Sequence, residues 1–267
     1  MRKCFIFLFL FLGILSNTAQ TKLLSWNIQN LGKTKSPEEI AQMAQILKDY
    51  DIVAIQEVVG VDTGGAQAVA LLVDELNRKG AAWDYVLSLP TDSPGKKTER
   101  YAFLWKTSKV KGIGRGQLLT LSDSVYREPF LMTFEVDQKR IHILNYHSRK
   151  YDDQPETEIK EVVDWVLRQD GNVILAGDFN VSENASVFNR LYQNAYQAAL
   201  QNTPTTLKKA CKEGVYTHHA IDNIFYNTHF IKKIYSGVVD FVKSCEKLEA
   251  ARLLSDHLPV VLQFEIK

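Results

Sequence analysis

The sequence predicts an α/β (α+β) fold built of mixed β-sheets with helices packed on the outside. Three observations favour this fold class. Short apolar runs bounded by turn-forming residues recur along the chain, as is typical of buried strands. Stretches with helical periodicity occur singly between groups of strands. Several connections between strands are too short for a crossover helix, which argues against a purely parallel doubly wound sheet.

The N-terminal part of the chain is expected to alternate strands with helices. The clearest helix covers residues 37–49, because Ser36 can cap its first turn, Pro37 suits the first helical position and Glu39 completes a capping box. An apolar stripe at helical spacing follows, which predicts that one face of this helix is buried. The other elements expected here are the strands Thr21–Ile28 and Asp51–Gln56 and the helix Ala66–Arg78.

From Trp83 onward the pattern changes to strands and turns. Strands are expected over Trp83–Ser88, Tyr101–Trp105, Val110–Arg115, Pro129–Val136 and Arg140–Tyr146. Further along, we expect helices over Pro155–Arg168 and Ser186–Tyr196, and strands over Ile221–Tyr226, Ile234–Val239 and Pro259–Phe264. The polar segment Gln201–Gly214 has no clear periodicity, so no element is predicted for it.

The stretch Val173–Asn180, VILAGDFN, combines a buried strand with polar residues at its end. Gly177 lacks a side chain and therefore allows a neighbouring backbone or a ligand to come close. If the strand continues, its period of two places Asp178 and Asn180 on one face and Phe179 on the other. The alternative is a strand that ends in an Asx turn, which is common for Asp and Asn.

Residues 1–20 are predicted to be a secretory signal peptide. Arg2 and Lys3 precede the strongly apolar run Phe5–Leu15, and small polar residues follow it. The run is too short for a spanning helix, so no membrane span is expected after signal removal, and an uncleaved anchor is the alternative. We therefore expect a secreted or periplasmic protein whose residues 21–267 form a single domain.

Charge and cysteine content narrow the classes of partner. The chain has 32 basic and 31 acidic residues, and removing Arg2 and Lys3 leaves a net charge of about −1. No global basic field is available, so a nucleic acid must be bound through local patches such as Arg149-Lys150. Cys211 and Cys245 remain after signal removal; they can form one bridge or stay as two free thiols.

Polar residues that are hard to explain as turns or surface lie at the ends of predicted strands. They are Asn27, Glu57, His147, Asp178, Asn180, Asp222, Asp256 and His257. Each has a structural explanation on its own, such as a helix cap or a core histidine with its hydrogen bonds satisfied. Burying several such groups costs several kcal/mol unless they meet a cation or one another. The pattern therefore indicates a shared site.

Eight sequence blocks place this site in a known context. They are SWNIQNLG, DIVAIQEV, TERYAFLW, YREPFLMTF, LNYHS, ILAGDFN, AIDNIFY and SDHLPV, and they spread from residue 25 to residue 260. In content and order they resemble the DNase I-like endonuclease/exonuclease/phosphatase superfamily, most of all its secreted deoxyribonucleases. The resemblance implies a two-sheet β-sandwich flanked by helices on both outer faces, with a site at one rim that hydrolyses phosphate esters.

The resemblance also implies a divalent metal site made of oxygen ligands. Glu57 takes the place of the principal ligand and Asn27 lies next to it, while Asp178 and Asp256 belong to the same acidic cluster. Hard oxygen ligands of this kind suit Mg²⁺, Mn²⁺ or Ca²⁺ rather than a soft metal.

The catalytic roles implied by the resemblance centre on two histidines. His257 pairs with Asp222 and activates water, and His147 pairs with Glu99 and assists departure of the leaving oxygen. The remaining roles fall to three residues: Asp178 ligates the metal or orients water, Asn180 binds the phosphate and the nucleophile, and Arg127 binds the phosphate with its planar fork.

The expected function is a secreted metal-dependent endonuclease with DNA as its substrate and no obligate protein partner. Gln29 and Val59 stand where pancreatic deoxyribonucleases have arginines, so recognition of a duplex is expected to differ. Two alternatives remain. One is a phosphatase or phosphodiesterase acting on inositol phosphates or phospholipid head groups. The other is a non-catalytic or toxin-like binding module on the same fold.

Overall fold

The computed structural model describes residues 20–94, 98–169 and 172–267. The strands of its first sheet are β1 (Thr21–Leu31), β2 (Ile52–Val59), β3 (Trp83–Leu87), β4 (Glu99–Lys106), β13 (Ile231–Val238) and β14 (Val260–Ile266). Those of the second are β5 (Lys111–Leu118), β6 (Phe130–Val136), β7 (Lys139–His147), β8 (Val173–Asp178), β9 (Tyr196–Ala198) and β12 (Asp222–Asn227). The predicted signal peptide lies outside the described residues, except for Gln20.

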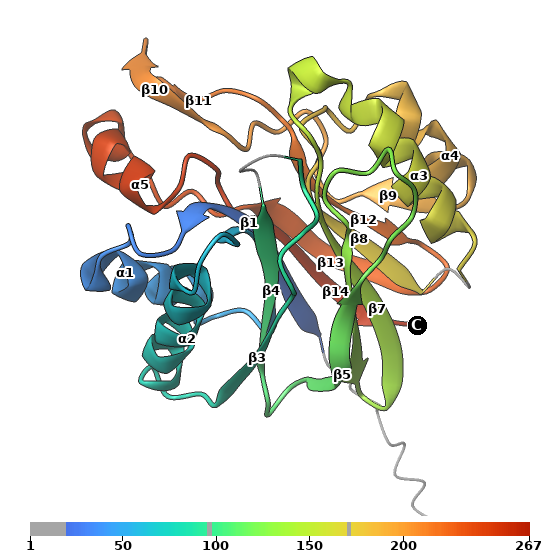
Figure 1. The fold of residues 1–267 in the computed structure, drawn as a ribbon, viewed down its shortest axis with the longest axis horizontal. Helices are drawn as coiled ribbons and strands as arrows, with labels where there is room; N and C mark the ends of the chain where they lie inside the picture. Colours follow the sequence, from blue (N-terminus) through green and yellow to red (C-terminus); the bar gives the residue numbers. More distant parts are fainter. Residues whose placement is uncertain (1–19, 95–97, 170–171) are drawn as a thin grey trace, which may run out of the picture.

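The two sheets pack face to face as a sandwich with helices outside (Figure 1). The strand orders are β13-β14-β1-β2-β4-β3 and β5-β6-β7-β8-β12-β9. The helices are α1 (Pro37–Leu47), α2 (Gly64–Asn77), α3 (Pro155–Leu167), α4 (Asn189–Gln193) and α5 (Leu248–Leu254). The predicted sandwich with helices on both outer faces is therefore confirmed. Among the described residues, no helix has both the length and the apolar character needed to cross a bilayer.

The apolar residues of the strands alternate between two hydrophobic layers. On β1, Leu23 packs in the core between the sheets and Leu24 packs under α1 and α2. On β8, Ile174 faces the core between the sheets, whereas Leu175 packs in the layer that also contains residues of α3. This alternation follows from the period of two in a strand. It leaves each sheet buried on both faces over its central strands.

Two parallel strand pairs bring the predicted site residues to one edge of the sandwich. β1 runs parallel to β2, and β7 runs parallel to β8, while the other pairs within the two sheets are antiparallel. In the second sheet Asp178 lies opposite His147 on one side and opposite Asp222 on the other. Residues that are distant in sequence thus become neighbours through strand register.

The helix predicted over Ser186–Tyr196 ends three residues earlier in the structure, at Gln193. After a 3₁₀ turn (Ser186–Phe188) and α4, Ala195 adopts a positive φ of 60° and the chain enters the edge strand β9. Tyr196 and Ala198 are buried against the layer under α3. Tertiary packing therefore outweighs the local helical pattern here.

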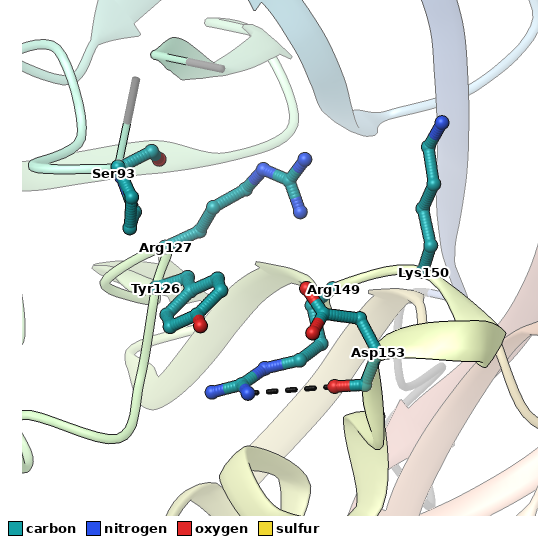
Figure 2. A pocket seen from close by; sticks show the side chains of 7 residues that line it. Ser93, Tyr126, Arg127, Arg149, Lys150 and Asp153 are labelled. Atoms are coloured by element: carbon teal, nitrogen blue, oxygen red, sulfur yellow. Dashed lines mark hydrogen bonds between the residues drawn. The ribbon is translucent and has the colours of Figure 1, made fainter. Parts of the chain in front are cut away.

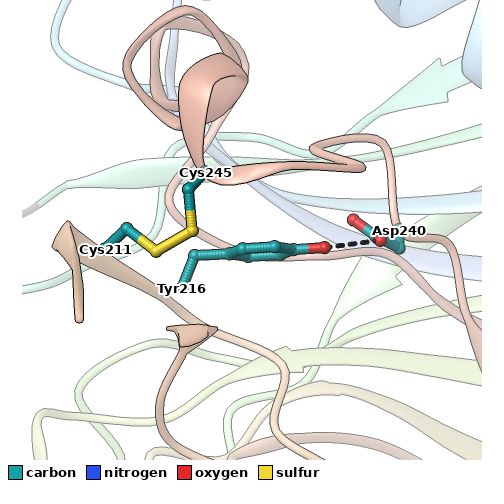
Figure 3. The surroundings of a disulfide bond; sticks show 4 residues. All are labelled: Cys211, Tyr216, Asp240 and Cys245. Carbon is teal, nitrogen blue, oxygen red and sulfur yellow. Dashed lines mark hydrogen bonds between the residues drawn. A yellow bond between two sulfur atoms is a disulfide. The ribbon is translucent and has the colours of Figure 1, made fainter. Parts of the chain in front are cut away.

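Two elements arise where no element was predicted. Part of the aperiodic segment forms the hairpin β10 (Leu207–Lys212) and β11 (Val215–Thr217), and α5 precedes the last strand. Cys211 on β10 is joined to Cys245 by a disulfide with a Cα–Cα distance of 5.6 Å (Figure 3). The possible bridge between the two cysteines is therefore confirmed.

Candidate active site

Glu57 is aimed at the rim of the sandwich by a bulge in β2. The register of β2 shifts at this residue against both of its neighbours, β1 and β4, and Glu57 has a φ of 60°. A positive φ is uncommon for a residue with a Cβ, and such strain is maintained only where the surroundings support it. The Glu57 carboxylate accepts hydrogen bonds from Asn27 Nδ2 at 3.1 Å and from the backbone N–H of Asn30 at 3.3 Å. The bulge thus turns the carboxylate toward Asn27.

Asp178 occupies the centre of the site. One of its oxygens, Oδ2, accepts a hydrogen bond from Asn27 Nδ2 at 3.0 Å, and the other accepts one from the backbone N–H of Asn180 at 2.9 Å. The strand ends here and Asn180 has a φ of 52°, so the Asx turn forms and the strand does not continue to Asn180. Gly177 is required before this turn, because a Cβ there would lie 1.7 Å from the Tyr146 carbonyl oxygen.

Phe179 supports the turn from the opposite side. Its ring is buried and meets the rings of Phe188 at 5.4 Å and Phe225 at 5.2 Å in edge-on contacts. Edge-on aromatic pairs of this kind are favourable beyond the area that they bury. The aromatic cluster therefore holds the Asp178–Asn180 turn on a rigid base.

His257 and Asp222 form the first of the two predicted pairs. The Nδ1 atom of His257 lies 2.9 Å from Asp222 Oδ2, which also accepts a hydrogen bond of 2.6 Å from the hydroxyl of Thr205. The backbone of His257 is held by Trp26, whose indole N–H donates to the His257 carbonyl at 2.8 Å. Nε2 is left facing Asp178 Oδ2 at 3.8 Å. Because Nδ1 faces a carboxylate, it carries a proton, and Nε2 is the atom available for chemistry.

His147 and Glu99 form the second pair with the same arrangement. Both carboxylate oxygens of Glu99 lie 3.0 Å from His147 Nδ1, and His147 Nε2 lies 3.5 Å from Asp178 Oδ2. Glu99 is itself held by Arg127, whose Nε lies 3.0 Å from Glu99 Oε2. The two imidazoles therefore present their Nε2 atoms to one and the same carboxylate oxygen.

The surrounding carboxylates raise the pKa of both imidazoles. For His257, burial acts to lower the pKa, but Asp222, Asp178 and Asp256 outweigh it and raise the pKa to about 10. For His147, burial again acts to lower the pKa, and Glu99 with help from Asp178 raises it above its ordinary value despite the opposing charge of Arg127. In the absence of a bound cation, these carboxylates thus favour the protonated form of both rings.

The two predicted phosphate ligands meet at the carbonyl oxygen of Ser148. This oxygen accepts hydrogen bonds from Arg127 Nη1 at 2.8 Å and from Asn180 Nδ2 at 3.2 Å. Arg127 is buried, so it is not the surface salt bridge that an arginine in a loop most often forms. The contact with Ser148 fixes the direction of both side chains next to His147.

Asp256 lies at the edge of the site and is partly exposed. Its carboxylate accepts a hydrogen bond from Gln29 Nε2 at 3.0 Å and lies 4.0 Å from His257 Nε2. Asn27 donates hydrogen bonds to both Glu57 and Asp178, whereas Asp256 reaches this group through His257. The predicted ligand set is thus three residues in contact and a fourth beside them.

The donors around Asn27 suit a hard divalent cation. Asn27 Oδ1 is buried and has no hydrogen-bond partner among the described residues, while its Nδ2 lies between the carboxylates of Glu57 and Asp178. Rotation of this amide by half a turn exchanges nitrogen for oxygen, and three oxygens then converge on one point. A second group that could hold a metal ion consists of Asp178, Asp222 and His257, whose ligand atoms lie within 4.8 Å of one another. That group is less suitable, because Asp222 already binds His257 and Thr205.

Several residues that support the site were not among the predicted site residues. Thr205, Ser148 and Gln29 hold Asp222, Arg127 and Asp256, respectively. Ser255 accepts a hydrogen bond from the His257 N–H at 3.0 Å and donates one of 2.6 Å to the Asn27 carbonyl. Ser148 and Ser255 directly neighbour site residues and lie within the sequence blocks LNYHS and SDHLPV, and Gln29 lies within SWNIQNLG. Thr205 lies in a segment without periodicity.

An open groove leads away from the site. Its volume is about 280 Å³, and its lining includes Asn30, Glu57, Val61, Glu99, Arg127 and Lys150. A smaller recess of about 20 Å³ adjoins it and shares Arg127 and Lys150 with it (Figure 2). In this recess Arg149 lies over the ring of Tyr126 at 3.7 Å and pairs with the buried Glu158 at 3.2 Å. Arg149 is therefore held in the wall of this recess.

Proteins named deoxyribonuclease are similar to this chain in sequence. A "Deoxyribonuclease" of Thioalkalivibrio sp. (strain K90mix) is 35% identical over 180 residues, which are 61% of this chain and 47% of that protein, so the chain spans about half the length of that relative. "Deoxyribonuclease-1-like 1" of Sus scrofa is 28% identical over 276 residues, covering 96% of this chain and 85% of that protein.

Structural similarity extends over nearly the whole chain. The crystal structure of an endonuclease/exonuclease/phosphatase family protein from Bacteroides thetaiotaomicron superimposes with a TM-score of 0.68 at 16% identity, covering 94% of this chain and 99% of that one. At this identity the likeness concerns the fold alone. The sequence model of the Endonuclease/Exonuclease/phosphatase family matches residues 24–257, a range that includes every predicted site residue. The chain therefore belongs to the endonuclease/exonuclease/phosphatase family of phosphoric-ester hydrolases.

Proposed function

We propose that this protein is a secreted, divalent-metal-dependent phosphodiesterase that cleaves DNA as an endonuclease. The observation that carries the proposal is the convergence of His147 Nε2 and His257 Nε2 on Asp178 Oδ2, at 3.5 and 3.8 Å. Hydrolysis of a phosphodiester needs one group that takes a proton from water and another that gives a proton to the leaving oxygen. Two imidazoles with the same orientation at one carboxylate provide both groups.

The two histidines are assigned different roles. His257 accepts a proton from the attacking water at Nε2, while Asp222 holds its ring in the required tautomer. His147 donates its Nε2 proton to the leaving oxygen, and its raised pKa supports this acid role. Arg127 and Asn180 orient the phosphate between the two rings, since both are fixed on the Ser148 carbonyl.

Asn27, Glu57, Asp178 and Asp256 would hold the divalent cation, with Mg²⁺ or Mn²⁺ as the expected ion and Ca²⁺ as a further candidate. When bound, it would neutralise charge on the phosphoryl oxygens and on the carboxylates that hold it. Asp178 and Asp256 are two of the three carboxylates that raise the pKa of His257. A bound cation would weaken the effect of these two carboxylates on His257. His257 would then lose its proton more readily, as a general base must.

DNA is the proposed substrate because relatives that are similar to this chain in sequence carry the name deoxyribonuclease. The family as a whole also includes phosphatases, so its fold does not select between a polynucleotide and a small phosphate ester. Export is proposed from the signal-like residues 1–20, and the Cys211–Cys245 bridge supports it, because disulfides persist in oxidising compartments. Residues 21–267 would then form the single catalytic domain.

Supercoiled plasmid tests this function. The purified protein is incubated with plasmid and Mg²⁺ or Mn²⁺, with and without excess chelator, beside the His257→Ala variant. Nicking that requires the metal and the histidine is the expected result. Intact plasmid together with hydrolysis of an inositol phosphate, a phosphomonoester or a phospholipid head group would replace the proposal with the phosphatase alternative. Intact substrates throughout would favour the binding module.

A further inference from the structure

A lysine-bearing hairpin rises directly from the rim of the candidate active site. We call the segment 207–217, which comprises β10 and β11, the finger. At its base the Leu207 N–H donates to the Asp256 carbonyl at 2.7 Å, and Thr206 forms a β-bridge with His257. Thr205, which binds Asp222, lies two residues before it. The finger is therefore a continuation of the segment that positions the catalytic residues.

The finger is also fixed along its length. Near its tip Cys211 is bonded to Cys245, and the Tyr216 hydroxyl donates to Asp240 at 2.7 Å (Figure 3). At its base Arg252 on α5 donates to the Leu207 carbonyl at 2.8 Å. Figure 1 shows β10 and β11 extending away from the two sheets. These attachments hold the finger in place, although its first strand has only one buried residue, Leu207.

The charge on the finger is positive and not compensated by ion pairs. Lys208, Lys209 and Lys212 lie within six residues, and Lys209 and Lys212 are exposed. Over the described part of the chain, every ion pair involves other basic residues. Glu213 at the turn is the acidic residue of the finger. Because the whole chain has a formal net charge of +1, this cluster is a local concentration of positive charge.

We propose that the finger holds the phosphate backbone of a polynucleotide beyond the bond that is cleaved. The proposal rests on the proposed nuclease function. It adds a surface that binds a long polynucleotide more tightly than a short phosphodiester. β10 bulges between Leu207 and Lys212, which pair with Thr217 and Val215, so the three lysines are gathered within a short length of the finger. Phosphates follow one another about every 3.4 Å along one strand of a duplex, so each of the three lysines can contact one phosphate. Contacts of this type give affinity and register without reading the base sequence.

The test compares two triple variants. Lys208→Gln/Lys209→Gln/Lys212→Gln removes the charge of the finger. The matched control, Lys109→Gln/Lys111→Gln/Lys233→Gln, removes three exposed lysines that lie away from the site and outside all ion pairs of the described chain. We expect the finger variant to raise KM for plasmid about tenfold at low salt with kcat unchanged. The slope of log kcat/KM against log salt should fall by about two to three, since each phosphate contact contributes about 0.9. Hydrolysis of bis(4-nitrophenyl) phosphate, which is too small to reach the finger, should not change.

A binding measurement separates failure of the finger from failure of the nuclease function. Fluorescence anisotropy of a labelled 20-base-pair duplex is recorded in excess chelator, where no cleavage occurs. About tenfold weaker binding by the finger variant than by the control supports the finger, even if the wild-type protein nicks no plasmid and the nuclease proposal fails. Wild-type nicking with KM, salt slope and duplex affinity unchanged in the finger variant would overturn the finger alone. The finger proposal would also be overturned if the finger variant bound the duplex as tightly as the control but bound vesicles that contain phosphatidylserine more weakly.

Discussion

Gln56 and Asn145 connect the two sheets through a hydrogen bond of 2.6 Å from Gln56 Nε2 to Asn145 Oδ1. Both side chains are completely buried. Gln56 immediately precedes Glu57, and Asn145 lies two residues before His147 on β7. Asn145 Nδ2 in turn donates to the Ile55 carbonyl at 3.0 Å. This polar contact within an apolar core therefore sets the position of β2, which leads into Glu57, relative to β7, which carries His147.

Asn145→Ala should lower the free energy of unfolding by about 2–3 kcal/mol. The substitution removes the Asn145 acceptor of the buried Gln56 amide, which keeps only its hydrogen bond to Ser25 Oγ at 3.1 Å, and it removes the Asn145 donor to the Ile55 carbonyl. Loss of a partner by a buried polar group costs more than the hydrogen bond itself. Urea unfolding measures the change. The double variant Gln56→Leu/Asn145→Leu should lose less than the sum of its single variants, because it removes both partners together. Strict additivity would contradict this coupling.

His147→Ala and His257→Ala should each lower kcat on a phosphodiester by roughly two to four orders of magnitude. Each ring is the proton donor or acceptor of one half of the proposed reaction, and each is held by its own carboxylate. The thermal transition should stay cooperative in both variants. His229→Ala, which alters a histidine in the turn between β12 and β13, serves as the matched control and should keep wild-type activity. A kcat close to wild type in either site variant would remove that histidine from the mechanism.

Much of this site follows from the sequence because strand ends are local features. Asn27, Glu57, Asp178 and His147 come directly after or within apolar runs, and the parallel pairs β1–β2 and β7–β8 bring such ends together. The bulge at Glu57 was not predictable, because no glycine or proline marks it and its positive φ is stabilised by tertiary contacts.

The partners of the site residues were beyond local reasoning for a related physical reason. Thr205 reaches Asp222 only because the chain before the finger returns across the rim. The first strand of the finger buries a single residue, so its pattern of burial gives no period. The disulfide could be inferred from the number of cysteines and the predicted export signal, but its place between the finger and the segment before α5 needed the fold.

Glu57→Gln should abolish the stabilisation of the protein by Mg²⁺. A cation that binds only the folded state adds about 2.7 kcal/mol when its concentration is about 100 times Kd. The wild-type thermal midpoint should therefore rise with added Mg²⁺ or Mn²⁺, and the midpoint of the variant should not. Glu75→Gln on α2 provides a control that keeps the response. An equal rise in Glu57→Gln would place the cation elsewhere, and the group of Asp178, Asp222 and His257 would be the next candidate.

In the presence of chelator, the free energy of unfolding should fall as the pH rises from about 6.5 to about 10. The pKa of His257 is raised to about 10 in the folded protein by its neighbouring carboxylates, against an ordinary value of 6.5. Between these values the folded state binds more protons than the unfolded state, so increasing pH favours unfolding. The stabilisation is complete below pH 6.5 and is lost as the pH passes the folded pKa. His257→Gln should show a smaller slope in urea unfolding over this range, and an identical slope would contradict the raised pKa.

Cys211→Ser/Cys245→Ser should lower the free energy of unfolding by about 4 kcal/mol. The bridge closes a loop with a sequence separation of 34 residues, and its removal restores the corresponding freedom to the unfolded chain. The variant should also weaken binding of the labelled duplex in chelator, because its finger is held only at the base and by Tyr216. Hydrolysis of bis(4-nitrophenyl) phosphate should persist, since the hydrogen bonds of Leu207 with Asp256 and of Thr205 with Asp222 do not involve the disulfide. Loss of the small substrate together with the duplex would instead mean that the disulfide holds the catalytic residues themselves.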